Sequence, residues 1–155
     1  MQKLKVDSFQ VVGLAQRTSN ANGQAAREIA ELWGRFVQEQ LVAQIPNRVD
    51  DTIYSLYTDY EGDHTQPYTV LLGCRVTNTE QIPEGMESRT IRGGEYVKFN
   101  TRGDLNDGIV VAQWHKIWNS NLQRAYTSDY EVWDTRAQNP ADAEIDFYIA
   151  LDESA

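Results

Sequence analysis

The segment at residues 128–134, SDYEVWD, contains one glutamate among aromatic residues. Aromatic and β-branched residues outnumber helix formers, and polar residues bracket the segment, so we expect a β-strand. Because side chains alternate between the faces of a strand, Glu131 and Trp133 point to the same face. Either this face is solvated, or the carboxylate is a counter-charge for a cation that the indole ring also attracts.

Five further aromatic residues are candidates for a binding site. Tyr57 lies in the strand-like segment TIYSLYTDY and is the strongest of them. Tyr68 and Tyr148 lie in other strand-like segments, where half-buried packing explains them as well as ligand contact does. Trp114 and Trp118 are one helical turn apart and share a helix face, where packing against a sheet is the favoured alternative.

The remaining reactive residue types form no recognisable site. The single cysteine, Cys74, excludes an intramolecular disulfide and sits on an apolar strand face. With Cys74, the histidines His64 and His115 lack the spacing of a zinc site, and neither has a partner at the spacing of a catalytic group. The glycine-rich IRGGEY lacks the spacing of a phosphate loop. We therefore expect no metal, no cofactor and no catalytic residue.

Composition indicates a single folded domain over residues 1–155. Hydrophobic residues make up 41% of the chain and charged residues 24%, which is ordinary globular usage. The net charge of -9 repels phosphate backbones and anionic lipids, so nucleic acid and membranes are not expected partners. No apolar run is long enough for a signal peptide or a membrane span, and we expect a cytoplasmic protein.

Hydrophobic periodicity gives the order strand, helix, strand, strand in each half of the chain. In the first half, a strand over about 4–17 precedes a helix that Asn22 caps and Pro46 stops, and two strands follow. These two strands are expected at 52–60 and 68–76. The second half is expected to contain a strand around 88–100, a helix over 108–122, and strands at 128–134 and 144–151.

The two halves also resemble one another in sequence. Residues 32–41 align without gaps on residues 113–122, which pairs Trp33 with Trp114. Internal repeats usually bury a face against each other, so we expect repeats over about 1–78 and 84–152. The predicted fold class is α+β, a pseudo-twofold duplication of a strand-helix-strand-strand unit. One antiparallel sheet would carry both helices on one face, and the uncovered face would be free to form an open ligand groove.

One combination of residues extends over the whole chain: Tyr57 and Asp59; Tyr68 and Gly73; Gly93, Gly94, Tyr96, Phe99 and Gly103; Trp114 and Trp118; then SDYEVWD and EIDFYIAL. This pattern resembles the GyrI-like effector-binding domains. Such domains are found fused to DNA-binding modules in AraC-type and MerR-type multidrug regulators, and also as stand-alone proteins.

The resemblance implies a groove for amphipathic, often cationic, small molecules, with a glutamate at its floor that maps to Glu131. Trp133 departs from the family, since many relatives have a tyrosine there, and no helix-turn-helix segment precedes the domain. We expect a stand-alone protein that senses or sequesters such compounds. The resemblance also implies two alternatives. One is a hydrolase of cyclopropane-bearing toxins that uses Glu131 with Tyr57 or Tyr148, and the other is an acidic inhibitor that docks on a basic protein partner.

Overall fold

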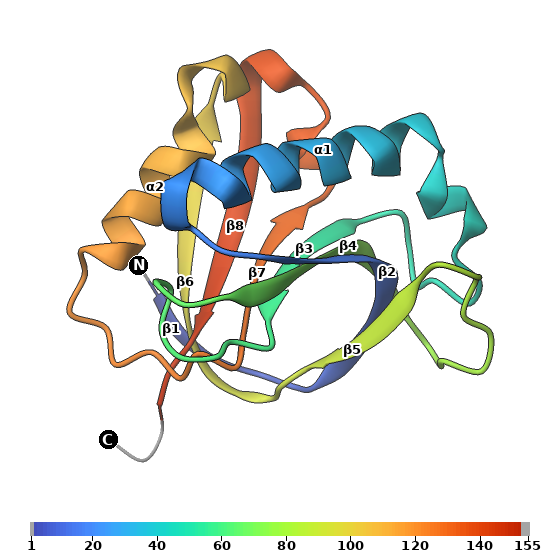
Figure 1. Cartoon of the computed structure of the whole chain (residues 1–155), viewed down its shortest axis with the longest axis horizontal. Helices are drawn as coiled ribbons and strands as arrows, with labels where there is room; N and C mark the ends of the chain where they lie inside the picture. The colour runs from blue at the N-terminus through green and yellow to red at the C-terminus, as the bar shows by residue number, and fades with distance from the viewer. Residues whose placement is uncertain (1, 153–155) are drawn as a thin grey trace.

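The computed structural model describes residues 2–152, which form one eight-stranded antiparallel sheet and two α-helices (Figure 1). The strands are β1 (Gln2–Val6), β2 (Phe9–Thr18), β3 (Ile53–Thr58), β4 (Tyr68–Val76), β5 (Glu87–Ile91), β6 (Gly94–Gly103), β7 (Ser128–Trp133) and β8 (Ala143–Ala150). The helices are α1 (Gln24–Gln38) and α2 (Ile109–Trp118). Neither of these two helices is long and apolar enough to cross a membrane.

The strand order β1-β6-β8-β7-β3-β4-β2-β5 reads symmetrically from its centre outward. At the centre, β3 pairs with β7, and Ser55 lies opposite Glu131. Each half contributes two strands, a helix and two more strands. The first strand of each half crosses to the other half, because β1 pairs with β6 and β5 pairs with β2. The expected α+β fold with a pseudo-twofold arrangement is therefore observed.

Each half has one strand more than the sequence predicts. The strand expected over 4–17 is interrupted between Val6 and Phe9, and the strand expected around 88–100 is interrupted between Ile91 and Gly94. The two interruptions lie opposite each other in the sheet, because Val6 pairs with Gly94 and Phe9 pairs with Ile91. Asp7 and Ser8 stand at the first break and Gly93 at the second, and these residue types favour turns, so the expectation of one continuous strand in each place is wrong.

The first helix is shorter than the sequence predicts, because it ends well before Pro46. Helix α1 ends at Gln38, Gln40 takes a left-handed conformation with φ of 53°, and a 3-10 turn follows at Leu41–Gln44. The residue before the helix is Gly23, with φ of 71° and no side-chain cap, so the expected capping role of Asn22 is wrong. Leu41 and the following Ile45 are nonetheless buried, which explains why the hydrophobic periodicity outlasts the helix.

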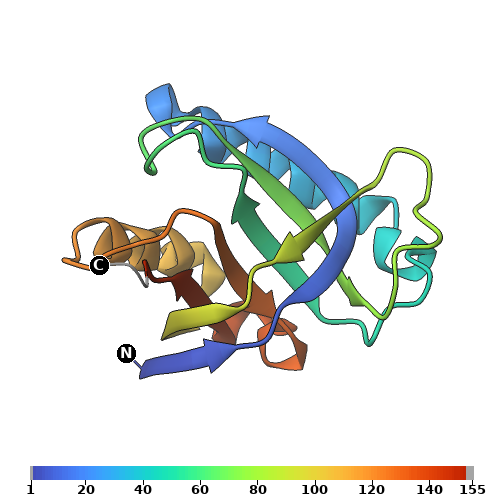
Figure 2. The ribbon, with the colours of Figure 1, turned by 90° about the horizontal axis from the view of Figure 1, so that it is seen from below.

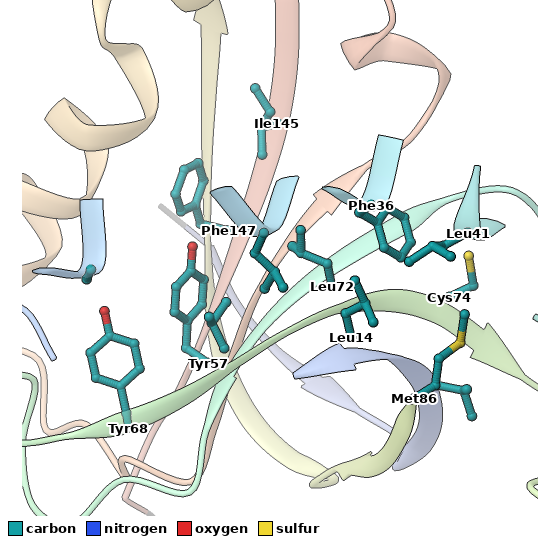
Figure 3. Close-up of a cluster of buried hydrophobic side chains, with 14 of the residues drawn as sticks. Leu14, Phe36, Leu41, Tyr57, Tyr68, Leu72, Cys74, Met86, Ile145 and Phe147 are labelled. Atoms are coloured by element: carbon teal, nitrogen blue, oxygen red, sulfur yellow. The ribbon is translucent and has the colours of Figure 1, made fainter. Parts of the chain in front are cut away.

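Both helices lie over the same face of the sheet (Figure 1). Between helices and sheet lies the larger core, in which Phe36 from α1 packs near Leu14, Leu72 and Phe147 from the strands (Figure 3). The opposite face carries a second core of Val11, Leu56, Leu71, Ile91, Tyr96, Tyr130 and Ala150. These residues are buried although no helix covers them, because β2 bends strongly and the sheet curls over this face (Figure 2).

Candidate functional site

A cavity of about 720 Å³ opens between the two helices and the sheet. Its wall includes aromatic side chains from both halves of the chain and one carboxylate: Trp33, Tyr57, Tyr68, Trp114, Trp118, Trp133 and Glu131. The expectation of a groove on the uncovered face is wrong, since the curl of the sheet fills that face with its own core. The cavity lies instead on the face that carries the helices.

Glu131 is the carboxylate of this cavity, and only 1% of the residue is exposed. Its Oε2 accepts hydrogen bonds from the Tyr57 hydroxyl at 2.7 Å and from Trp114 Nε1 at 2.6 Å. Its Oε1 accepts one from Trp133 Nε1 at 2.8 Å. Burial raises the pKa of Glu131, and the three donors act against that rise. All three donors are uncharged, and within residues 2–152 Glu131 forms no ion pair.

The aromatic contacts around Glu131 follow the pseudo-twofold axis. Trp114 packs on Tyr57 with ring centroids 4.8 Å apart, and Trp33 packs on Trp133 at 4.9 Å. The sequence repeat relates Trp33 to Trp114. A twofold axis through the central Ser55–Glu131 pair also relates Tyr57 to Trp133, each two residues further along its strand. The aromatic wall is therefore duplicated, and the charge is supplied by one half only.

Two other predicted residues lie toward one end of the cavity. The Tyr68 hydroxyl donates to Asn20 Oδ1 at 2.6 Å, and burial raises the pKa of Tyr68 to about 12. Its ring and that of Tyr57 point toward the helix layer (Figure 3). Trp118 stacks on His64, with an interplanar angle of 6° and ring centroids 5.3 Å apart.

Tyr148 is the predicted site residue that the structure does not bring to the cavity. It belongs to the opposite face of the sheet, where it stacks on Tyr130 at 4.7 Å. Its neighbour Phe147 faces the helices and contacts Trp114. Alternation along β8 therefore places Tyr148 away from Glu131.

A second buried carboxylate lies two residues before Glu131 on the same face of β7. Asp129 is 0% exposed, and its Oδ2 accepts hydrogen bonds from Arg124 Nη2 at 2.8 Å and from the Tyr60 hydroxyl at 2.7 Å. The Arg124 guanidinium also lies over the Tyr126 ring, 4.4 Å from its centroid. Asp129 is thus neutralised inside the protein, whereas Glu131 is not.

Several residues of the cavity wall were not predicted. Trp33 is one of them, although its pairing with Trp114 in the sequence repeat is a usable signal. Arg124 and His64 lie in loops that no periodicity marks, and Tyr60 follows β3, which ends two residues before the expected bound of 60. Among residues 2–152, no group of three or more His, Cys, Asp or Glu side chains is arranged to hold a metal ion.

Comparison with known proteins agrees with this architecture. Residues 4–151 match the model of the family described as Cass2, integron-associated effector binding protein. The protein YobU of Bacillus subtilis (strain 168), named as a transcriptional regulator, is 29% identical over 150 residues, which cover 94% of each chain. The resemblance to GyrI-like effector-binding domains is thereby confirmed.

Two solved structures share the fold. An integron cassette protein from the mobile metagenome of Vibrio cholerae has a TM-score of 0.74 and 28% identity, covering 97% of this chain and 95% of that chain. The structure of SAV2435 bound to tetraphenylphosphonium has a TM-score of 0.75 and 16% identity, covering 99% of this chain and 94% of that one. The predicted fold class is confirmed by both.

Proposed function

The chain belongs to the Cass2 family of integron-associated effector binding proteins, and we propose that its cavity binds amphipathic organic cations with Glu131 as their counter-ion. The observation that carries this proposal is the state of Glu131: a fully buried carboxylate surrounded by uncharged donors. A buried charge is costly unless an opposite charge accompanies it. A bound cation would supply that charge.

Asp129 provides an internal comparison. It lies on the same strand face, two residues away, and Arg124 neutralises it while the Tyr126 ring covers the guanidinium. A carboxylate on one side and an aromatic ring on the other is the environment that stabilises a desolvated cation. We infer that a ligand cation takes, beside Glu131 and the indoles of Trp114 and Trp133, the place that Arg124 takes beside Asp129.

The dimensions of the cavity fit a compound of drug size. Its volume of about 720 Å³ lies within the range of roughly 300–1,000 Å³ that is usual for small-molecule sites. Six of the predicted residues line it, namely Glu131, Trp133, Tyr57, Tyr68, Trp114 and Trp118. The tetraphenylphosphonium bound to SAV2435, a protein of the same fold, is a bulky aromatic cation and supports this ligand class.

The test compares a cation with an anion of the same shape. Tetraphenylphosphonium and tetraphenylborate are titrated by calorimetry into the parent protein and into Glu131→Gln, which keeps the side-chain shape and deletes the charge. We expect the parent to prefer the cation strongly. Glu131→Gln should weaken cation binding by about 2–5 kcal/mol, because the cation would then be buried without a counter-charge.

A matched control removes the same charge outside the cavity. Glu31 is exposed on α1, so Glu31→Gln changes the net charge equally and should leave both affinities within about 0.5 kcal/mol of the parent. Equal preference for cation and anion in the parent and in a folded Glu131→Gln protein would disprove the proposed role of Glu131.

A hydrolytic function is the second candidate, and one contact favours it. The Tyr57 hydroxyl lies 2.7 Å from Glu131 Oε2, which is a suitable geometry for an acid and base pair. Burial, followed by the charge of Glu131, raises the pKa of Tyr57 well above its ordinary value, so this hydroxyl keeps its proton. Incubation with a cyclopropane-bearing electrophile separates the two functions. A hydrolase would form product, and its Glu131→Gln variant would not. A binding protein would form no product in either case.

A further inference from the structure

The cavity has a polar end whose hydrogen-bonding groups are incompletely used. The Arg124 side chain is only 3% exposed, and of its nitrogens Nη2 bonds to Asp129. Its Nε and Nη1 are buried without a partner among the described protein atoms, and so is Nδ1 of His64. Both residues line the cavity. A buried donor without an acceptor lowers stability, so these groups need an acceptor from outside the chain.

The Arg124 guanidinium is held rigidly in place. Asp129 fixes one edge of it and is itself fixed by the Tyr60 hydroxyl and by the backbone N–H of Ala150. The ring of Tyr126 covers the guanidinium plane at 4.4 Å, and the backbone of Tyr126 is left-handed with φ of 55°. A planar, fixed fork of donors is suited to recognition of an oxygen atom.

We propose that the preferred ligands of this cavity carry a second feature besides the cationic centre: an uncharged oxygen acceptor that receives hydrogen bonds from Arg124. This inference rests on the proposed function and specifies its ligand class. Glu131 and Asp129 are two residues apart on β7, about 7 Å along the strand. The acceptor therefore belongs on an arm that extends from the cation toward the Asp129 end of the cavity.

The charge balance favours a neutral acceptor over an anionic one. Asp129 already neutralises Arg124, and Glu131 adds a second negative charge on the same strand face. A ligand carboxylate would bring a third anion into a buried site that holds one fixed cation, which costs both repulsion and desolvation. A carbonyl oxygen accepts a hydrogen bond from one of the free N–H groups of Arg124 at no such cost.

His64 is the second donor that we assign to this end. Its ring stacks on Trp118, and its backbone oxygen accepts a hydrogen bond from Asn20 Nδ2 at 2.8 Å, which fixes the loop. Burial and then the charge of Arg124 lower the pKa of His64, so the ring is neutral near pH 7. A neutral imidazole whose Nδ1 carries the proton donates to the same acceptor.

The test uses two phosphonium probes that differ by one acceptor: benzyltriphenylphosphonium and its 4-acetylbenzyl analogue. The readout is the ratio of their affinities, measured by calorimetry. In the parent we expect the acetyl probe to bind about tenfold more tightly. The ratio should fall toward one in the double variant Arg124→Met with Asp129→Asn, which removes donor and carboxylate together and leaves no buried charge unpaired.

Three further variants make the outcome decisive. Arg124→Lys keeps the ion pair to Asp129 but loses the fork, and it should also lower the ratio. His64→Phe keeps the stack on Trp118 and should lower the affinity ratio partly. Arg102→Lys makes the same exchange at an exposed ion pair with Asp142 and should leave the parent ratio unchanged.

The results separate this inference from the proposed function. If Glu131→Gln weakens binding of both probes but the parent shows no acetyl preference, the acceptor site is wrong and the cation site stands. The same conclusion follows if the preference survives in the folded double variant. If neither probe binds the parent, or if Glu131→Gln binds both as the parent does, the proposed function fails and this inference fails with it.

Discussion

At the scale of single residues, the two buried carboxylates of β7 differ in how their charge is balanced. Asp129 has Arg124, whereas Glu131 has three neutral donors. Because burial raises the folded-state pKa of Glu131, the stability linked to its protonated form is present at low pH and is lost as pH rises through that pKa. An ionised Glu131 therefore destabilises the unliganded protein, and the proposed cationic ligand would offset this cost.

We predict that affinity for tetraphenylphosphonium rises with pH. Below the raised pKa of Glu131, a cation must displace one proton, so affinity should increase up to about tenfold per pH unit from the ordinary carboxyl value of 4.5 upward. Above that pKa the affinity should level off. Calorimetry between pH 4.5 and 8, repeated in buffers of different ionisation enthalpy, measures both the affinity and the proton released.

The other titratable groups near Glu131 define the control for this prediction. Tyr57 keeps its proton throughout, and Asp129 is balanced by Arg124. His64 and His115 line the cavity, and protonation of His64 at low pH would also repel a cation. Glu131→Gln retains these histidines, so an unchanged pH dependence in that variant would assign the effect to them and contradict the prediction.

At the scale of elements, β2 and β4 approach each other unusually closely where two glycines face one another. Gly13 pairs with Gly73, and a Cβ atom on Gly13 would lie 1.8 Å from the Leu72 oxygen. One on Gly73 would lie 2.1 Å from the Val12 oxygen. Both glycines belong to the paired strands β2 and β4, and β2 is the strand that bends strongly in Figure 2.

We predict that Gly13→Ala destabilises the protein by at least about 2 kcal/mol, because backbone atoms cannot move aside as a flexible side chain can. Urea denaturation measures the change. Gly34→Ala is the matched control: Gly34 is an exposed residue of α1 with open space around its Cβ position, so this exchange should stabilise the protein by about 0.5–1 kcal/mol. Equal effects of the two substitutions would show that the close approach is not required.

At the scale of the whole molecule, duplication gives the cavity its paired aromatic residues, and a difference between the two halves gives it a single carboxylate. The two halves place equivalent tryptophans, Trp33 and Trp114, on either side of the sheet centre. The central pair is Ser55 and Glu131, so only one half supplies a carboxylate. The molecule as a whole is also acidic, with a net charge of -9.

We predict that this chain alone does not bind duplex DNA at physiological salt, because its net charge repels phosphates. A mobility-shift assay at micromolar protein, with a basic DNA-binding protein as positive control, should show free DNA only. A shift that disappears as salt is raised would contradict the prediction, since it would reveal electrostatic contacts that the net charge conceals.

Local patterns were sufficient for the order of the helices and of most strands, and for part of the site. Alternation along residues 128–134 placed Glu131 and Trp133 on one strand face, and the structure shows them hydrogen-bonded to each other. Helical spacing put Trp114 and Trp118 on one face of α2, and both line the cavity. These properties depend on neighbours within a few residues, which is why the sequence alone determined them.

Long-range packing decided the rest. Which sheet face holds the cavity depends on how far the sheet curls, and the curl is a property of several paired strands rather than of any one segment. Tyr148 had the right residue type, but its strand is paired so that it faces away. The contact between Trp33 and Trp133 and the neutralisation of Asp129 by Arg124 arise from separate elements brought together by folding. Such contacts leave no periodic trace in a sequence, so only the tertiary structure reveals that one of the two buried carboxylates of β7 lacks a counter-charge.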